Sequence, residues 1–193
     1  MNTIVLASAS PRRRELLQKY NIDPIIVKST IEEKIFANEK PEVIAMALAF
    51  EKVNSVMENF NDDEIIIGAD TLVCYDGKIL GKPKSEEDAI NMLKLLGGKK
   101  HEVITGLCIV KSGTNIKIID YEKTYVKFRD LDERTIKNYI DTKEYMDKAG
   151  AYGIQGIGGI LVEKIEGCYF NVVGLPLYRL DILLDRHFGI RLL

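Results

Sequence analysis

Short apolar runs alternate with amphipathic segments along the first half of the chain. The runs at residues 3–7, 24–27 and 64–68 are too short and too apolar for surface helices, so they predict strands. Helical periods occupy residues 12–20 and a longer segment from about Pro41. The apolar stripe predicted for the longer helix is Val43, Met46, Ala47, Phe50, Val53 and Met57. Strands that alternate with helices are typical of an α/β fold.

Hairpin signals appear in the second half. Asp76-Gly77 separates two short apolar runs and is a strong two-residue turn signal. Two long strands are predicted at residues 103–110 and 116–128, with a turn between them. The remaining predicted elements are helices at 85–97, 131–140 and 177–187 and a strand at 160–165. We therefore expect one α/β domain over residues 1–193, built on a mixed sheet.

The composition is that of an ordinary globular domain. The 193 residues are 46% hydrophobic and 29% charged, which is enough for a sizeable core. A formal net charge of −2 gives no overall positive field that would attract phosphate backbones, which disfavours a dedicated nucleic-acid-binding protein. Three separated cysteines without a CxxC pair disfavour a disulfide framework, and no apolar window approaches the roughly 20 residues of a membrane helix. We expect a cytosolic protein without a membrane partner.

Several common catalytic motifs are missing. The chain has no GxxxxGK[ST] loop, no GxGxxG fingerprint after a strand and no GxSxG elbow. His101 and His187 are the only histidines, which gives a serine-hydrolase triad little support. Any chemistry must therefore come from other polar segments.

The first such segment is Ser8-Ala-Ser10-Pro-Arg12-Arg13-Arg14, where a strand leads into a helix. Ser10 is a natural N-cap, and the amides, hydroxyls and guanidiniums of this segment together suit a phosphate group. A capped, solvated basic helix start explains the same residues about equally well.

Acidic and basic side chains elsewhere extend the candidate site. Asp70 directly follows a buried run, at what we expect to be the carboxyl end of a strand, although a turn-capping role fits as well. Lys52 shares a helical row with apolar residues and is placed either to reach a phosphate or to extend into water. A lysine such as Lys82 is more commonly an ordinary exposed side chain, and an acidic pair such as Glu32 and Glu33 is more often solvated than part of a metal site.

The last candidate is the small-residue loop at 149–156, in which Gln155 carries the only side-chain amide. Such a loop lets backbone approach a ligand, and the amide suits a base edge. A plain glycine-rich turn is the alternative. Together, basic groups, acids and an amide-bearing loop are the components needed to bind a nucleoside polyphosphate with a divalent cation.

These segments resemble the motifs of the Maf family of nucleoside triphosphate pyrophosphatases, in the group that acts on dTTP and UTP. The matching motifs are Ser8-x-Ser10-Pro-Arg-Arg13, Gly68-Ala-Asp-Thr71, Gly81-Lys-Pro83, Asp147-Lys-Ala-Gly-Ala-Tyr-Gly-Ile-Gln-Gly156 and Asn171-Val-Val-Gly-Leu-Pro176. They run from residue 8 to residue 176. Tyr145 departs from the pattern, because the family commonly has proline there, and Glu32 stands where aspartate is common.

The resemblance implies hydrolysis between the α- and β-phosphates, with Asp70 as proton acceptor. The other implied substrate-binding residues are Ser8, Arg12, Arg13, Glu33, Lys52 and Lys82. Arg12, Thr71 and Gln155 match positions associated with the choice of pyrimidine triphosphate. The implied fold is a two-lobed α/β protein with a long mixed sheet, similar to inosine triphosphatases, with the site in a cleft between the lobes.

Oxygen ligands such as Asp70 and Glu33 suit Mg²⁺ or Mn²⁺, so we expect a divalent metal cofactor. Two alternatives stay open at this point. One is a nucleotide-sensing binding module linked to cell division, which the acids argue against because a pure anion binder gains nothing from them. The other is a purine or 7-methylguanine triphosphate substrate. A homodimer is the expected assembly.

Overall fold

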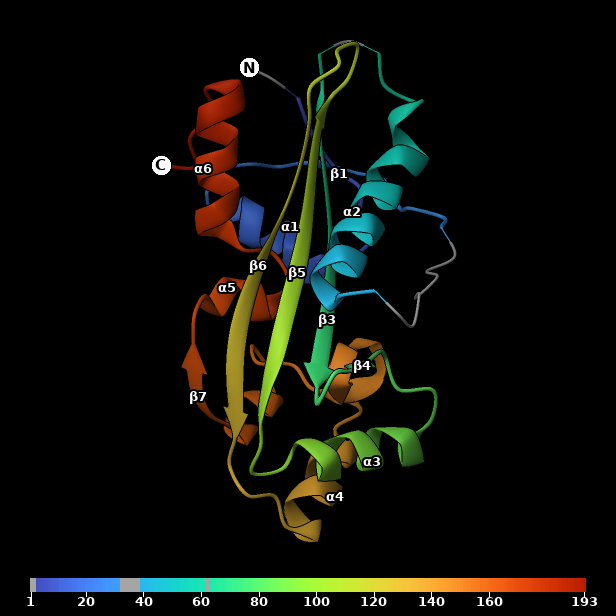
Figure 1. The fold of residues 1–193 in the computed structure, drawn as a ribbon, viewed down its shortest axis with the longest axis vertical. Helices are drawn as coiled ribbons and strands as arrows, with labels where there is room; N and C mark the ends of the chain where they lie inside the picture. The colour runs from blue at the N-terminus through green and yellow to red at the C-terminus, as the bar shows by residue number, and fades with distance from the viewer. Residues whose placement is uncertain (1–2, 32–38, 62) are drawn as a thin grey trace. The chain divides into compact units, whose positions relative to one another are not determined.

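The computed structural model describes residues 3–31, 39–61 and 63–193, which form a seven-stranded sheet with helices around it (Figure 1). The strand order is β2 (Ile25–Ile26), β1 (Ile4–Leu6), β3 (Ile65–Tyr75), β5 (Lys100–Lys111), β6 (Lys117–Phe128) and β7 (Val162–Glu166), and β4 (Lys78–Leu80) pairs with β3. β1 runs parallel to β2 and β3, whereas β3/β4 and β6/β7 are antiparallel. The mixed sheet confirms the predicted α/β class.

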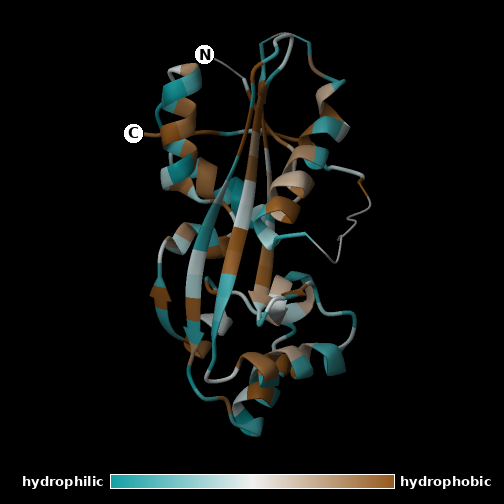
Figure 2. Ribbon diagram, viewed as in Figure 1, coloured by the Kyte–Doolittle hydropathy of each residue, from teal (hydrophilic) through white to brown (hydrophobic). Residues whose placement is uncertain are grey.

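Six α-helices accompany these strands in the described residues. They are α1 (Pro11–Gln18), α2 (Pro41–Met57), α3 (Glu86–Leu96), α4 (Glu133–Asp141), α5 (Tyr169–Val173) and α6 (Leu177–Phe188). Three short 3₁₀ turns, η1 (Glu144–Asp147), η2 (Ala149–Ala151) and η3 (Ile157–Leu161), lie between α4 and β7. Every predicted helix is present, and α5 was not predicted. Brown and teal alternate on α6 in Figure 2, as expected of a helix with one buried face. None of the described helices is long and apolar enough to cross a membrane.

The chain divides into two compact units. Unit 1 comprises residues 1–70, 105–122 and 174–193, and unit 2 comprises residues 71–104 and 123–173. The long strands β3, β5 and β6 each contribute to both units, and the boundary on β3 falls between Asp70 and Thr71. The two-lobed architecture is thus confirmed as two compact units, while one functional domain over residues 1–193 stays a prediction.

In unit 1, α2 packs against β1, β3 and β5, and Figure 1 shows α6 on the other side of these strands. The buried residues of α2 are Ile44, Ala45, Leu48, Ala49, Val53 and Val56. Of the predicted stripe, Val53 is buried and Phe50 and Met57 pack partly buried against the same cluster. The prediction was wrong at Val43, which is 43% exposed, and at the exposed Ala47. The small side chains of Ala45 and Ala49 let the helix approach the sheet closely, so the buried face follows them and not the bulkiest residues.

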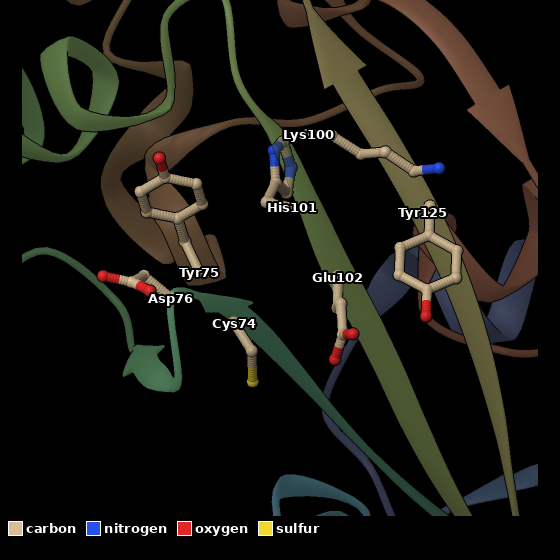
Figure 3. Close-up of a pocket in the computed structure, with 7 residues that line it drawn as sticks. All are labelled: Cys74, Tyr75, Asp76, Lys100, His101, Glu102 and Tyr125. Carbon is tan, nitrogen blue, oxygen red and sulfur yellow. The ribbon is translucent and has the colours of Figure 1, made fainter.

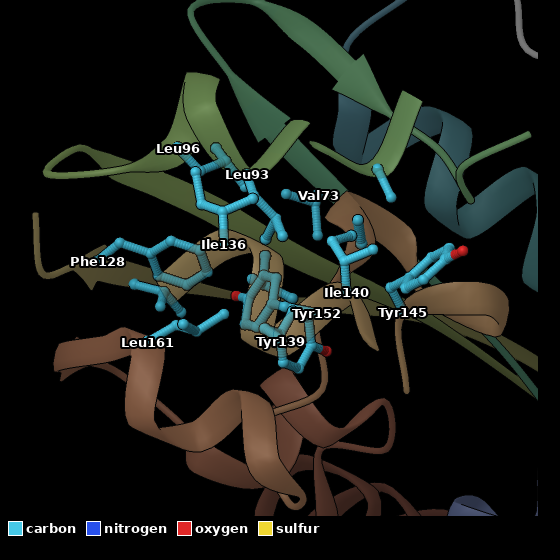
Figure 4. Packing of buried hydrophobic residues seen from close by; sticks show 14 residues of the cluster. Val73, Leu93, Leu96, Phe128, Ile136, Tyr139, Ile140, Tyr145, Tyr152 and Leu161 are labelled. Atoms are coloured by element: carbon cyan, nitrogen blue, oxygen red, sulfur yellow. The ribbon is translucent and has the colours of Figure 1, made fainter. Parts of the chain in front are cut away.

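In unit 2, α3 and α4 pack with aromatic residues from the strands and loops (Figure 4). The buried cluster includes Leu93, Leu96, Phe128, Ile136, Tyr139, Ile140, Tyr145 and Tyr152. His101 packs edge-on against Phe128 and Tyr152, with ring centroids 5.0 Å and 5.5 Å away. Its Nε2 lies 2.9 Å from the Tyr152 hydroxyl, and its Nδ1 has no hydrogen-bond partner among the described residues.

The buried His101 should make the protein less stable in acid. Burial lowers the pKa of His101 from 6.5 to about 4. Between these values the unfolded chain binds a proton that the folded chain does not. The free energy of unfolding should therefore fall as the pH drops from 6.5 towards 4, by up to about 3 kcal/mol.

Urea unfolding at several pH values measures this slope in the wild type and in His101→Gln, where the slope should be shallower. The matched control is His187→Gln, because His187 is exposed and should leave the slope unchanged. Equal slopes in the wild type and His101→Gln would contradict the assignment.

Candidate functional site

The predicted phosphate segment follows β1 in unit 1, where the chain turns from the strand into α1. Ser8 is buried, and its Oγ accepts hydrogen bonds from the Ser10 N–H at 3.2 Å and from Nη1 of Arg13 at 3.1 Å. Arg13 is only 9% exposed, and its Nε donates to the Gly174 carbonyl at 2.7 Å. The structure thus brings two predicted site residues into contact and orients the guanidinium with a hydroxyl and a carbonyl.

Ser10 precedes α1 as predicted, with Pro11 in the first turn, but its side chain makes no capping hydrogen bond. The helix start is therefore stabilised differently from the expectation, because Ser8 takes the N–H of Ser10. Arg12 follows in the first turn and is half-buried. The helix N-terminus and two guanidiniums all belong to this short segment, which suits an anion.

The second pair of predicted residues lies between α2 and β3, also in unit 1. Nζ of Lys52 contacts Oδ1 of Asp70 in an ion pair whose side chains are only 12% and 8% exposed. Lys52 continues the buried row of Ile44 and Leu48, as predicted, and ends against a carboxylate. Removal of two charges from water is unfavourable unless they are paired, so this contact holds both groups in place.

The prediction that Asp70 lies at the end of a strand is wrong, because β3 continues through Asp70 to Tyr75. The parallel pairing does end nearby: the last register pair is Leu6 with Ile67, and the Ala7 N–H donates to the Ile67 carbonyl at 2.8 Å. Ser8 follows Leu6 by two residues and Asp70 follows Ile67 by three. The Ser8–Arg13 and Lys52–Asp70 contacts therefore lie at the same, carboxyl end of the parallel strands, where α/β proteins bind ligands.

Gly68 allows α2 to come close enough for Lys52 to reach Asp70. It lies two residues before Asp70 on β3, so both face the helix. A Cβ at Gly68 would lie 2.7 Å from the Ala49 carbonyl oxygen and 2.6 Å from a methyl group of Val53. Gly106 on β5 likewise leaves no room for a Cβ beside the backbone of Ala45.

Gly68→Ala should therefore push α2 outwards and destabilise the fold by about 1–3 kcal/mol. Chemical denaturation measures this loss. Gly81→Ala serves as the control, since a Cβ there meets nothing within 4 Å. Equal stability of the two variants would show that α2 does not depend on this close approach.

Three further predicted residues belong to unit 2. Lys82 is exposed directly after β4, and Gln155 is exposed between η2 and η3. The Gly150 N–H donates to the Gly81 carbonyl at 3.1 Å, which joins the Gly81-Lys82-Pro83 motif to the loop at 149–156. Thr71 is half-buried, and because it follows Asp70 on β3 its side chain faces the opposite side of the sheet. Glu33 lies outside the described residues.

The predicted metal ligands are Asp70 and Glu33. Within residues 3–31, 39–61 and 63–193, no group of three or more His, Cys, Asp or Glu side chains is arranged to hold a metal ion. Asp70 is therefore the one predicted ligand whose surroundings are described.

Sequence reasoning missed two groups that support the predicted residues. One is the Gly174 carbonyl, which orients Arg13 but, as a backbone group, gives no signal in a search for polar side chains. The other is the Glu144 carboxylate, which binds backbone amides of the Gln155 segment. The signal for this contact in the sequence was an acidic residue followed by several closely spaced glycines.

A pocket of about 320 Å³ lies in unit 2, and none of the predicted site residues lines it (Figure 3). Its lining residues are Cys74, Tyr75, Asp76, Lys100, His101, Glu102 and Tyr125. Lys100 pairs with Glu166 at 2.5 Å and lies 4.6 Å from the centroid of the Tyr125 ring. Hydrogen bonds from Lys100 and Lys164 lower the pKa of Glu166 to about 2. Lys100 thus already interacts with a carboxylate and an aromatic ring of the protein itself.

Comparison with known proteins supplies close relatives over the whole chain. A protein of Clostridioides difficile (strain 630) named dTTP/UTP pyrophosphatase is 51% identical over 98% of this chain and 97% of its own length. A protein of the same name from Alkaliphilus oremlandii (strain OhILAs) is 51% identical over 100% of both chains. A third relative with this name, from Caldanaerobacter subterraneus, is 50% identical over 97% of this chain and 90% of its own.

A solved structure titled nucleoside-triphosphatase / dITP/XTP pyrophosphatase, from Mycobacterium abscessus, aligns with 97% of this chain and 96% of its own. The TM-score is 0.45 and the identity 12%, too weak a similarity to support a conclusion. The family model described as Maf-like protein matches residues 3–187. The chain therefore belongs to the Maf family.

Proposed function

We propose that this protein hydrolyses dTTP and UTP between the α- and β-phosphates, releasing the nucleoside monophosphate and pyrophosphate. The observation that carries the proposal is the buried Lys52–Asp70 pair at the same end of the parallel strands as the Ser8–Arg13 contact. The full-length relatives named dTTP/UTP pyrophosphatase support the choice of substrate.

The cationic side chains offset the charge of the triphosphate, which otherwise repels an attacking nucleophile. Arg12 and Arg13 bind phosphate oxygens from the start of α1, and Lys82 adds a third cation. Arg13 is held by Gly174 and Ser8, so its guanidinium is oriented before substrate binds and loses little freedom on binding.

Asp70 takes the proton of the attacking water. In the free protein its carboxylate is bound by Lys52. When a phosphate oxygen of the substrate competes for the Lys52 ammonium, the Asp70 carboxylate becomes available to the water molecule. Lys52 thus positions the Asp70 carboxylate in the free protein and stabilises the negative charge of the phosphate during the reaction.

A divalent cation, Mg²⁺ or Mn²⁺, fits the donor atoms of this site. Asp70 is a buried carboxylate beside the phosphate-binding segment, and Mg²⁺ in nucleotide sites commonly takes one or two carboxylates together with substrate phosphates. Asp70 is the proposed protein ligand, with Glu33 as the second carboxylate. A bound metal would lower the pKa of a water molecule and neutralise phosphate charge.

The remaining predicted residues keep the roles that family resemblance implies. Glu33 also binds substrate, while Thr71 and Gln155, with Arg12, select the pyrimidine base. The Gln155 amide offers both a donor and an acceptor to a base edge.

A triphosphate panel tests the proposal. Purified protein is incubated with dTTP, UTP, CTP and GTP, with Mg²⁺ and Mn²⁺ in parallel, and the products are separated by ion exchange. We expect UMP and pyrophosphate from UTP. UDP and phosphate would place the cleavage elsewhere, and retention of intact UTP would show a binding module.

We further propose that the protein acts in the cytoplasm as a homodimer. Buried Cys74 and Cys108 and the absence of any described disulfide suit a reducing compartment. Exposed Ile119 and Tyr121 alternate along one face of β6, in a part of the strand that does not pair with β7. An exposed strand edge of this kind can pair with the same strand of a second copy of the chain. Sedimentation velocity measures the assembly state.

A further inference from the structure

One carboxylate binds the segment that carries Gln155. Oε2 of Glu144 accepts a hydrogen bond from the Ile157 N–H at 2.7 Å, and Oε1 accepts one from the Gly158 N–H at 3.1 Å. Gln155 lies two residues before Ile157 and is exposed. Because hydrogen bonds to an ionised acceptor are stronger than neutral ones, this carboxylate is a firm anchor for the backbone after Gln155.

Tyr139 of α4 binds the backbone on the other side of Gln155. Its hydroxyl donates to Oε1 of Glu144 at 3.3 Å and accepts the Gly153 N–H at 3.3 Å. Burial and the nearby Glu144 charge raise the pKa of Tyr139, so the hydroxyl stays a donor at neutral pH. Gly153 and Gly158 flank the turn, and both are thus tied to the Tyr139–Glu144 pair.

The glycines of this segment serve the same contact. A Cβ at Gly156 would overlap the carboxylate of Glu144, and one at Gly158 would lie 2.7 Å from the Gly153 carbonyl oxygen. The backbone therefore folds tightly around the acid. The glycines are therefore needed for packing within the protein, and their role in letting a ligand approach stays a prediction.

Glu144 itself is fixed by its neighbours. Its N–H donates to Oγ1 of Thr142 at 3.2 Å, and that hydroxyl donates to the Tyr139 carbonyl at 2.6 Å. Tyr145, which stands where the family commonly has proline, is 6% exposed and packs in the buried cluster of unit 2 (Figure 4). The backbone and neighbours of Glu144 thus hold it in one position, as a well-positioned binding group requires.

We propose that Glu144 is a positioning residue for base selection: it holds the turn that presents the Gln155 amide to the pyrimidine base. This inference rests on the proposed function. The preferred base is then one with a carbonyl at the 4-position, as in uracil and thymine, over one with an amino group there, as in cytosine. These two groups present an acceptor and a donor respectively, so only an amide held in one orientation distinguishes them.

Glu144→Gln tests the proposal with minimal change in size. The amide places an NH₂ group, which cannot accept, where one carboxylate oxygen now accepts an N–H. We expect the ratio of kcat/KM for UTP to that for CTP to fall about 5- to 20-fold. The change should appear in the KM for UTP and not in kcat, because in the proposed reaction Gln155 binds the base and takes no part in the proton transfer at Asp70.

Glu86→Gln is the matched control. It removes the same charge from an exposed side chain. The Glu86 carboxylate pairs with Lys143, the residue before Glu144, at 2.6 Å, and does not bind the amides of the turn. Its UTP/CTP ratio should equal that of the wild type. An equal fall in both variants would mean that net charge, and not the position of the turn, sets the ratio, and would overturn the proposal.

A double-variant cycle with Gln155→Ala shows whether Glu144 acts through Gln155. In that background Glu144→Gln should change the UTP/CTP ratio no further, whereas a second full fall would overturn the proposal. If Glu144→Gln fails to fold, Tyr139→Phe takes its place, since it removes one hydroxyl from the same network. A folded variant with the wild-type ratio refutes the inference alone, while a wild type that hydrolyses no pyrimidine triphosphate refutes the proposed function first.

Discussion

Replacement of Asp70 by asparagine should lower kcat for UTP hydrolysis by about 10²–10⁴-fold, the usual effect of losing a general base. Asparagine keeps the size of the side chain and can still accept a hydrogen bond from Lys52, but it cannot take up a proton from water. The KM for UTP should change less than kcat, because the cationic side chains Arg12, Arg13 and Lys82 remain to bind phosphate. Steady-state release of pyrophosphate measures both constants.

Asp76→Asn is the control for this experiment. Asp76 occupies the β3–β4 turn, a position in which asparagine is equally well accommodated. It makes the same chemical change on the same hairpin outside the predicted site, and it should retain wild-type kcat. Undiminished turnover in Asp70→Asn would remove Asp70 from the mechanism.

Replacement of Lys52 by methionine should have the largest effect on stability. The ion pair is nearly buried, with side chains 12% and 8% exposed, so the variant leaves the Asp70 carboxylate in low-dielectric surroundings without its lysine. Loss of one member of a buried pair costs about 3 kcal/mol, and turnover should also fall because the phosphate loses a cation. Urea denaturation and UTP turnover measure the two effects.

The double variant Lys52→Met/Asp70→Asn separates charge from packing. When both charges are removed together, the stability should recover most of the way to that of the wild type. Lys164→Met is a suitable control, because this lysine is 63% exposed and pairs with Glu166 on the surface at 3.0 Å. Surface pairs contribute little, so its stability should match the wild type. Equal losses for Lys52→Met and Lys164→Met would contradict a stabilising role for the buried pair.

Local sequence signals predicted most of the elements correctly. The Asp76-Gly77 turn joins β3 and β4 as expected. The helix predicted from residue 85 is present as α3, and the structure shows that the Ser85 side chain caps it by accepting the Asp88 N–H at 3.1 Å. Lys52 was also placed correctly, on the row of Ile44 and Leu48, because the helical period is a property of the chain itself.

Two expectations failed where neighbours in space decided the outcome. The stripe on α2 was assigned to large residues such as Val43, whereas the structure buries the face that carries Ala45 and Ala49. Asp70 was expected at the end of a strand, but β3 continues beyond it because β4 pairs with its second half. For the stripe, the deciding partner is a glycine on another strand, which is not visible within the local window. For Asp70, the hairpin signal at Asp76-Gly77 was available, but it did not show that the buried run before Asp70 and the first hairpin strand form one continuous strand.

The amino-acid sequence alone determined the α/β class, the helical and turn elements and the family, because periodicity, turn residues and extended motifs are written along the chain. Tertiary structure alone decided which groups meet: Lys52 with Asp70, Arg13 with Ser8 and the Gly174 carbonyl, and Glu144 with the amides after Gln155. Apart from Ser8 and Arg13, which are neighbours in sequence, these contacts join residues from separate elements. They depend on strand register and on how closely a helix approaches the sheet. No local pattern encodes either quantity.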